Sequence, residues 1–91
     1  MKVHDIKIME MFVDPILTGD KNFEIRKNDR VFQKGDYIHF MPVKADGVTE
    51  IRSEIYKRRY KITYVLSGWG LQNGYVALGI HDVTGIESEE K

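Results

Sequence analysis

Apolar side chains recur at every second position in several short segments of this chain. In the clearest case an apolar set alternates with a mostly polar one: Tyr60, Ile62, Tyr64 and Leu66 against Lys61, Thr63, Val65 and Ser67. Because successive side chains of a strand point to opposite faces, this alternation predicts a strand with one face toward a core. Comparable patterns predict strands at 5–9, 22–27, 37–43 and 75–83, while 49–56 stays open between a strand and a helical turn.

The segment 11–17 departs from that alternation and spaces its apolar residues roughly as a helix does. Asp14 as the cap and Pro15 in the first turn suit the start of a short helix, and Gly19 suits a left-handed end. One or two short helices among five or six strands predict an α+β fold. We expect a small, mostly antiparallel β-barrel with a helix over one opening.

The composition predicts a single domain without a membrane-spanning segment. The chain has 91 residues, 42% of them hydrophobic, and residues 1–83 are expected to form the single domain, followed by an acidic tail at 84–91 that frays. No apolar stretch approaches the roughly 20 residues of a membrane span, and the first residues lack the apolar core of a signal peptide. With no cysteine for disulfides, we predict a cytoplasmic protein; its oligomeric state stays open.

Residues 19–30 are the most informative segment for function, since seven of these twelve residues are charged. On a strand, Phe23 and Ile25 would face the core, while Glu24 and Arg26 would share the opposite face. Lys21, just after Gly19, could reach either face. An acid flanked by cations on a rigid strand is typical of a site for an anion or a nucleobase. The alternative is an ion pair of Lys21 and Glu24 that only holds the helix–strand turn.

The formal net charge is zero, yet the cations are concentrated in the middle of the sequence. Residues 21–34 and 52–61 are both basic, and most acids lie nearer the two ends. If the two segments fold together, they make one positive face that attracts polyanions in a salt-dependent way. Otherwise they are ordinary solvated strand faces.

The pattern Gly19-x-Lys21-x-x-Glu24-x-Arg26 resembles the signature of ASCH domains, a branch of the PUA-like superfamily. With its extension through Asn28, Asp29 and Arg30 and the later segments Gly35-Asp36, 62–65 and 74–80, the chain is similar over residues 3–83 to a small bacterial and phage family called DUF3850. The resemblance implies a PUA-like β-barrel with a cleft beside the helix. It also implies that the cleft holds the signature residues and binds RNA.

The expected function is therefore an RNA- or nucleotide-binding module without cofactor or metal. Its predicted binding residues are Lys21, Glu24, Arg26, Asn28, Arg30 and Trp69. Arg26 can grip a phosphate or a base edge with its planar fork, Glu24 can accept from an exocyclic amine, and Lys21 supplies a compact charge. Trp69, in a glycine-rich loop, is either a stacking platform or a packed lid. Asp29 is more simply explained as turn chemistry.

Two other functions stay open. In a small hydrolase acting on a modified nucleoside or on RNA, Lys21 would activate water or act as nucleophile and Glu24 would be the general acid or base. Hydrolytic ASCH relatives carry a threonine three residues after the signature lysine, whereas this chain has Glu24 there. In a protein-interaction domain, the basic face would instead bind an acidic partner. The three histidines show no metal-ligand spacing.

Overall fold

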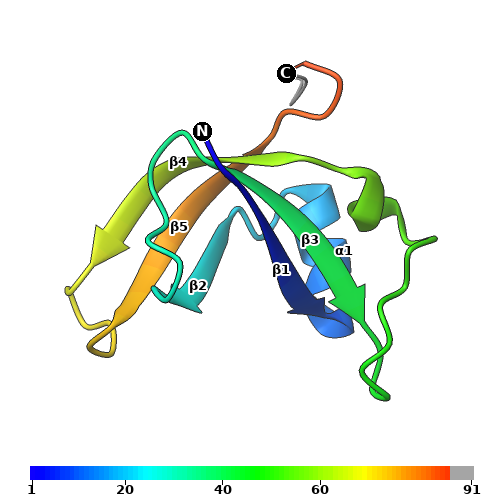
Figure 1. Cartoon of the computed structure of the whole chain (residues 1–91), viewed down its shortest axis with the longest axis horizontal. Helices are drawn as coiled ribbons and strands as arrows, with labels where there is room; N and C mark the ends of the chain where they lie inside the picture. Colours follow the sequence, from blue (N-terminus) through cyan, green and yellow to red (C-terminus); the bar gives the residue numbers. More distant parts are fainter. Residues whose placement is uncertain (87–91) are drawn as a thin grey trace.

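The computed structural model describes residues 1–86, which fold around one strongly bent sheet (Figure 1). The strands are β1 (Val3–Met9), β2 (Phe23–Lys27), β3 (Tyr37–Val43), β4 (Tyr60–Ser67) and β5 (Tyr75–Asp82). The helical elements are α1 (Val13–Thr18) and the 3₁₀ turns η1 (Glu10–Phe12) and η2 (Glu54–Lys57). Most of the acidic tail predicted at 84–91 lies outside the described residues, because the description ends at residue 86.

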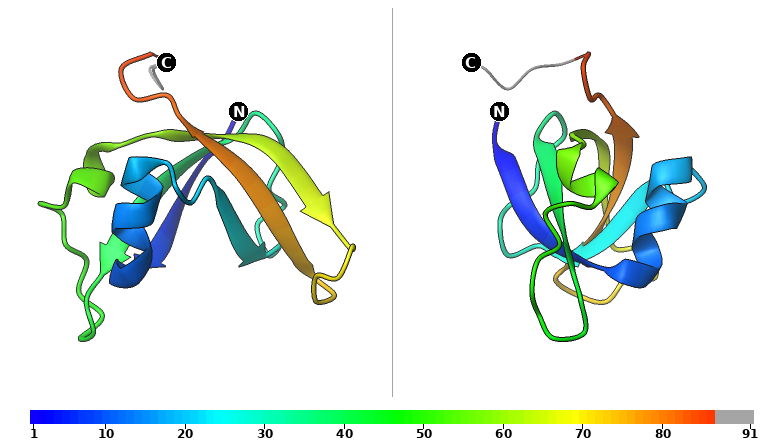
Figure 2. Two further views of the ribbon diagram at one scale, coloured as in Figure 1. Left: turned by 180° about the vertical axis from the view of Figure 1, so that it is seen from behind. Right: turned by 90° about the vertical axis from the view of Figure 1, so that its right-hand side faces the viewer.

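The five strands are ordered β1-β3-β4-β5-β2, with β1 parallel to β3 and the remaining neighbours antiparallel. The sheet forms an arch, with β1 and β3 on one limb and β4, β5 and β2 on the other (Figures 1 and 2). Since β1 and β2 are the two ends of this order, they are edges and the sheet is not closed. The α+β prediction is confirmed, whereas closure into a barrel is not.

The core lies inside the arch and is almost entirely aliphatic and aromatic. Its fully buried members come from η2 and from every strand except β2: Ile6, Ile38, Phe40, Pro42, Ile55, Ile62 and Leu78. Ile16 adds the buried contact of α1. Each such side chain contributes about 1.5–3 kcal/mol when it leaves water. The alternation at 37–43 and at 60–62 therefore marks the core correctly.

The end of α1 determines where β2 begins. Gly19 adopts the left-handed conformation with φ 86°, and its N–H donates to the Ile16 carbonyl at 3.1 Å. The Lys21 N–H then donates to the Pro15 carbonyl at 2.9 Å. This confirms Gly19 as the end residue, but the helix begins at Val13 with Phe12 before it, so Asp14 lies in the first turn and is not the cap.

The two faces of β2 are reversed relative to the prediction. Phe23 and Ile25 are 45% and 50% exposed, while Glu24 is only 5% exposed. Glu24 and Arg26 do share a face, as the alternation requires, but that face points into the arch. Burial of Glu24 is possible because two cations neutralise its carboxylate. The prediction that Phe23 and Ile25 face the core is therefore wrong.

The segment 49–56, which the sequence left open, is mainly turn. Thr49 makes an isolated antiparallel bridge to Val43, and η2 follows at Glu54–Lys57 with Ile55 buried in the core. No helix within residues 1–86 is long and apolar enough to cross a membrane.

Candidate nucleic-acid interface

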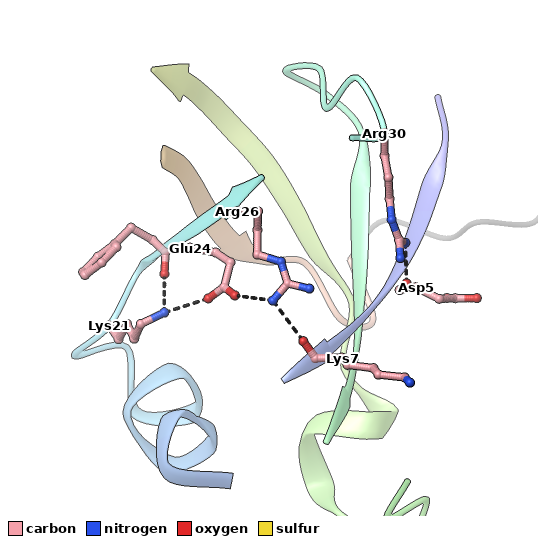
Figure 3. A network of polar contacts seen from close by, with 7 residues as sticks. Asp5, Lys7, Lys21, Glu24, Arg26 and Arg30 are labelled. Carbon is pink, nitrogen blue, oxygen red and sulfur yellow. Dashed lines mark hydrogen bonds and ion pairs between the residues drawn. The ribbon is translucent and has the colours of Figure 1, made fainter. Parts of the chain in front are cut away.

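The candidate site lies in the gap between the edge strands β1 and β2, which we call the seam. Two arginines bridge it from the β2 side (Figure 3). Arg26 donates through Nη1 to the carbonyl of Lys7 at 3.0 Å, and Arg30 donates through Nη1 to the carbonyl of Asp5. These carbonyls belong to the free edge of β1. The arginines therefore satisfy acceptors that an uncovered strand edge would leave open to another chain.

Glu24 is the centre of a charged cluster on the inner side of β2. Its Oε1 accepts from Lys21 Nζ at 2.7 Å and its Oε2 accepts from Arg26 Nη1 at 3.2 Å (Figure 3). Lys21 Nζ also donates to the Phe23 carbonyl at 2.8 Å. The same ammonium lies 5.0 Å from the ring centre of Phe12 and 4.9 Å from that of Phe23. The ion pair of Lys21 and Glu24 that the sequence offered as an alternative is therefore present, and a binding role for these residues stays a prediction.

This cluster keeps a positive charge after pairing, because two cations share one carboxylate. The contacts of Arg26 to Glu24 and Lys7 both use Nη1. A guanidinium carries five N–H donors. Among the described residues, the donors on Nε and Nη2 of Arg26 have no acceptor, so they can serve a ligand. Glu24 thus acts as the residue that orients the arginine.

Beside these arginines is a pocket of about 280 Å³, which we call the seam pocket. It is lined by Ile6, Ile25, Arg26, Lys27, Asp29, Arg30, Phe32 and Tyr75. Three of these side chains are cationic and one is acidic, and within residues 1–86 neither Lys27 nor Arg30 forms an ion pair. The partly exposed Tyr75 ring adds flat apolar surface, and the edge of the buried Phe32 ring, which is 4% exposed, closes the floor. Such a pocket suits an anion attached to a planar group.

Lys27, Phe32 and Tyr75 are site residues that the sequence reasoning did not select. Lys27 directly follows Arg26 in the charged segment, which was an available signal. Phe32 and Tyr75 gave no such signal, because an isolated aromatic residue is equally compatible with a core, and Phe32 does belong to the core as well as to the pocket floor. Their position at the seam depends on how far the sheet bends.

Two predicted binding residues lie outside the seam pocket. The side-chain oxygen of Asn28 accepts from the Phe32 N–H at 3.0 Å, and the backbone N–H of Asn28 donates to the Gly74 carbonyl at 2.9 Å. Asn28 therefore shapes the loop that carries Arg30. Trp69 lies in the β4–β5 connection and is 89% exposed, with φ 53°. The structure thus excludes the packed-lid interpretation of Trp69 but does not bring it to the seam.

A buried histidine–carboxylate contact holds the loop that follows β2. His4 Nε2 lies 2.9 Å from Asp36 Oδ2, and both residues are buried. Burial alone would raise the pKa of Asp36, but hydrogen bonds from His4 and from the N–H groups of Lys2 and Gln33 outweigh it and lower the pKa. The His4 ring also packs against Phe32, with ring centres 4.7 Å apart. This pair fixes one wall of the seam pocket.

The second basic segment does not contribute to the lining of the seam pocket. Arg58 pairs with Glu54 at 3.0 Å and with Asp82 at 3.2 Å. Arg59 lies over the Tyr37 ring, 5.6 Å from its centre. The cations that line the seam pocket, Arg26, Lys27 and Arg30, all come from residues 21–34. Across residues 1–86, no group of three or more metal-ligating side chains is arranged to hold a metal ion.

Comparison with known proteins identifies a family and a similar fold. The sequence model of DUF3850, a domain of unknown function, matches residues 3–80. A solved structure, that of the hypothetical protein PH0355, superposes with a TM-score of 0.57 at 20% sequence identity. The match covers 90% of this chain and 99% of that one. No curated protein matches the chain.

Proposed function

Since this chain belongs to the DUF3850 family, whose function is unknown, we propose a function from its own geometry: it is an RNA- or nucleotide-binding module whose site is the seam pocket. One observation carries the proposal. Arg26, Lys27 and Arg30 gather at a pocket that also has aromatic walls, and Asp29 is the only acid among its lining residues.

Each lining group has a role that follows from its chemistry. Arg30 and the Nε and Nη2 donors of Arg26 would bind phosphate oxygens, because a planar guanidinium matches the geometry of a phosphate group. Glu24 and Lys21 would hold Arg26 in place. Tyr75 would receive the base, since stacking on aromatic rings is the usual way single-stranded RNA is recognised, while Phe32, which is 4% exposed, would form the floor of the pocket. The ligand class therefore combines a phosphate with a flat ring.

The size of the pocket limits the ligand further. Small-molecule sites usually measure about 300–1,000 Å³, so a pocket of about 280 Å³ is at the low end. It would take one nucleotide, either free or as part of a strand that continues over the surface. A cytoplasmic location, where such ligands are abundant, is part of the proposal.

We also propose that the family is a branch of the ASCH domains within the PUA-like superfamily. The signature pattern supports this, because Gly19 ends the helix and Lys21, Glu24 and Arg26 meet beside it. The bent sheet with one short helix is what an incompletely closed barrel of that kind would look like.

Arg30→Gln tests the proposed site with little risk to the fold. Arg30 is exposed, and within the described residues its side chain contacts only one backbone carbonyl. The variant should bind a labelled single-stranded RNA more weakly. It should also lower the slope of log affinity against log salt by about 0.7, the value for one lost phosphate contact on a single strand.

The matched control is Lys57→Gln, which removes an exposed cation from η2. Its affinity should stay within twofold of the wild type, on the order of the error of such titrations. Wild-type binding weaker than about 100 μM at low salt, which is already the level of nonspecific contacts, would rule out the function. An equal loss in both variants would place the binding elsewhere.

A hydrolase is the second candidate, favoured by the direct contact of Lys21 with Glu24 at 2.7 Å. Lys21 also borders a second pocket of about 340 Å³ beside α1, where His81 and Asp82 lie. Acylated nucleosides and RNA should then be turned over by the wild type and not by Lys21→Ala or Glu24→Gln. Turnover that survives both substitutions would exclude these residues as the catalytic pair.

A further inference from the structure

The outer face of β2, β5 and β4 carries aromatic side chains that no other element covers in the described part of the chain. In the register of these strands, Gly79 of β5 lies between Phe23 of β2 and Tyr64 of β4. Phe23 is 45% exposed and Tyr64 is 61% exposed. These three strands run side by side on one limb of the arch (Figure 1). Two aromatic rings therefore flank a position that has no side chain.

A β-bulge produces this arrangement. The register of β4 against β5 shifts between Ile62 and Tyr64, so Thr63 and Tyr64 both lie against Gly79 and both are exposed. A Cβ atom on Gly79 would lie 2.9 Å from the Thr63 hydroxyl, so a side chain there would force Thr63 to move. Bulges are often found where a side chain must be redirected beside a functional site. The result is a slot with a backbone floor and one hydroxyl.

The spacing of the strands is compatible with a base between the two rings. The backbones that carry Phe23 and Tyr64 are two strand spacings apart, about 9.6 Å in total. A planar ring stacked between two others needs about 9–14 Å between the outer ring centres. The Thr63 hydroxyl at the floor can donate or accept a hydrogen bond at the edge of such a ring.

The charge on this face fits a polyanion. Lys27 and Lys61 are its ionised side chains, and none of the residues that β2, β4 and β5 direct outward is acidic. Lys21 Nζ also lies 4.9 Å from the centre of the Phe23 ring. Aromatic rings beside cations are the usual surface for single-stranded nucleic acid. An acidic protein partner would use the cations but would not need two rings around an empty position.

The face is continuous with the seam pocket. Ile25 lies next to Phe23 on the outer side of β2, and Ile25 and Lys27 also line the pocket. We propose that Phe23 and Tyr64 form a stacking clamp for a base of single-stranded RNA whose neighbouring phosphate occupies the seam pocket. The bound RNA would pass over the edge strand β2. This inference rests on the proposed function and adds a second contact site to it.

The test compares two labelled RNAs of about ten nucleotides, a length in the range of single-strand sites. One carries its bases and the other is abasic, so that only phosphate contacts remain. The clamp predicts that Tyr64→Ala weakens binding of the base-bearing RNA by roughly 5- to 100-fold, the range for one stacked base. The same variant should leave binding of the abasic RNA unchanged, and Tyr64→Phe, which keeps the ring, should bind both RNAs as the wild type does.

Arg30→Gln separates the two proposals, because loss of a phosphate contact should weaken both RNAs alike. If Tyr64→Ala binds the base-bearing RNA as tightly as the wild type while Arg30→Gln does not, the clamp is wrong and the seam site stands. If the wild type binds neither RNA, both proposals fail. If Tyr64→Ala only converts a dimer to a monomer in sedimentation, the face joins two copies of the chain and the clamp is wrong.

Discussion

The two faces of β2 differ in a way that reverses the usual distribution of polarity. The inner face carries Glu24 and Arg26 toward the arch, with Glu24 only 5% exposed. The outer face carries Phe23 and Ile25 into solvent, each about half exposed. Neighbouring residues of a single strand thus place a carboxylate inside and two apolar side chains outside. Each face needs its own explanation.

The difference shows that charge pairing can replace apolar packing on the inner side of an edge strand. Glu24 is tolerated there because Lys21 and Arg26 neutralise it. A buried carboxylate with these partners costs little, whereas the same carboxylate alone would be strongly destabilising. The apolar residues displaced to the outer side are then available for contacts with a ligand.

Removing the inner charge should have the largest effect on stability. Glu24→Gln leaves the cations of Lys21 and Arg26 close together without their shared carboxylate. We expect the free energy of unfolding to fall by about 3 kcal/mol, as for other broken buried pairs. Urea denaturation followed by circular dichroism measures it.

The matched control for this variant is Glu54→Gln, which removes the carboxylate of an exposed pair with Arg58. Its cost should stay below about 1 kcal/mol. Equal losses for the two variants would show that the Glu24 cluster is an ordinary surface network and would remove the contrast between the faces.

Asp36 is a second buried carboxylate, and it differs from Glu24 in how its charge is stabilised. Neutral backbone N–H groups supply part of the stabilisation of Asp36, whereas Glu24 is paired with two cations. The pKa of Asp36 is lowered in the folded state, so the charged form stabilises the fold at pH above the ordinary value of 3.8. That stability is lost as the pH falls through the folded-state pKa.

Asp36→Asn should therefore cost about 1–3 kcal/mol at neutral pH, and the difference from the wild type should shrink in acid below about pH 4. Thermal melts from pH 7 to pH 2.5, in the range where this group titrates, check the trend. A difference that grows as the pH falls would contradict the assigned contacts.

The outer face should be the least sensitive to substitution. Ile25→Thr keeps the branched side chain but removes apolar surface that is 50% exposed. The free energy of unfolding should change by less than about 0.5 kcal/mol. A decrease of about 2 kcal/mol or more in the free energy of unfolding is typical of a truncated core residue. Such a decrease would mean that Ile25 faces the core, as the sequence alone predicts.

Much of the fold could be predicted from the alternation. The strand at Tyr37–Val43 and the end of α1 at Gly19 agree with the sequence pattern. The strand predicted at 59–66 is shifted by one residue in β4, and β5 is one residue shorter than predicted. The faces of β2 could not be predicted, because alternation says which residues share a face but not which face is inside. That choice depends on the cations that meet at Glu24.

The candidate site could be predicted only for those residues that lie in one short segment of the sequence. Lys21, Glu24 and Arg26 are close in sequence, and a strand brings alternate residues together. The partners across the seam, the carbonyls of Asp5 and Lys7, belong to another edge of the sheet. No local pattern encodes how far a sheet bends, so these contacts and the position of Tyr75 required the structure.

The central claim is that the seam binds a phosphate attached to a base, and nuclear magnetic resonance of the labelled protein tests it most directly. Titration with a nucleoside monophosphate should shift the side-chain N–H signals of Arg26 and Arg30 and the ring signals of Phe32 and Tyr75 together. The signals of Lys57 and Arg58, at η2, should not move. Shifts at η2 instead of the seam, or no shift up to about 1 mM, the range of the weakest specific binding, would contradict the claim.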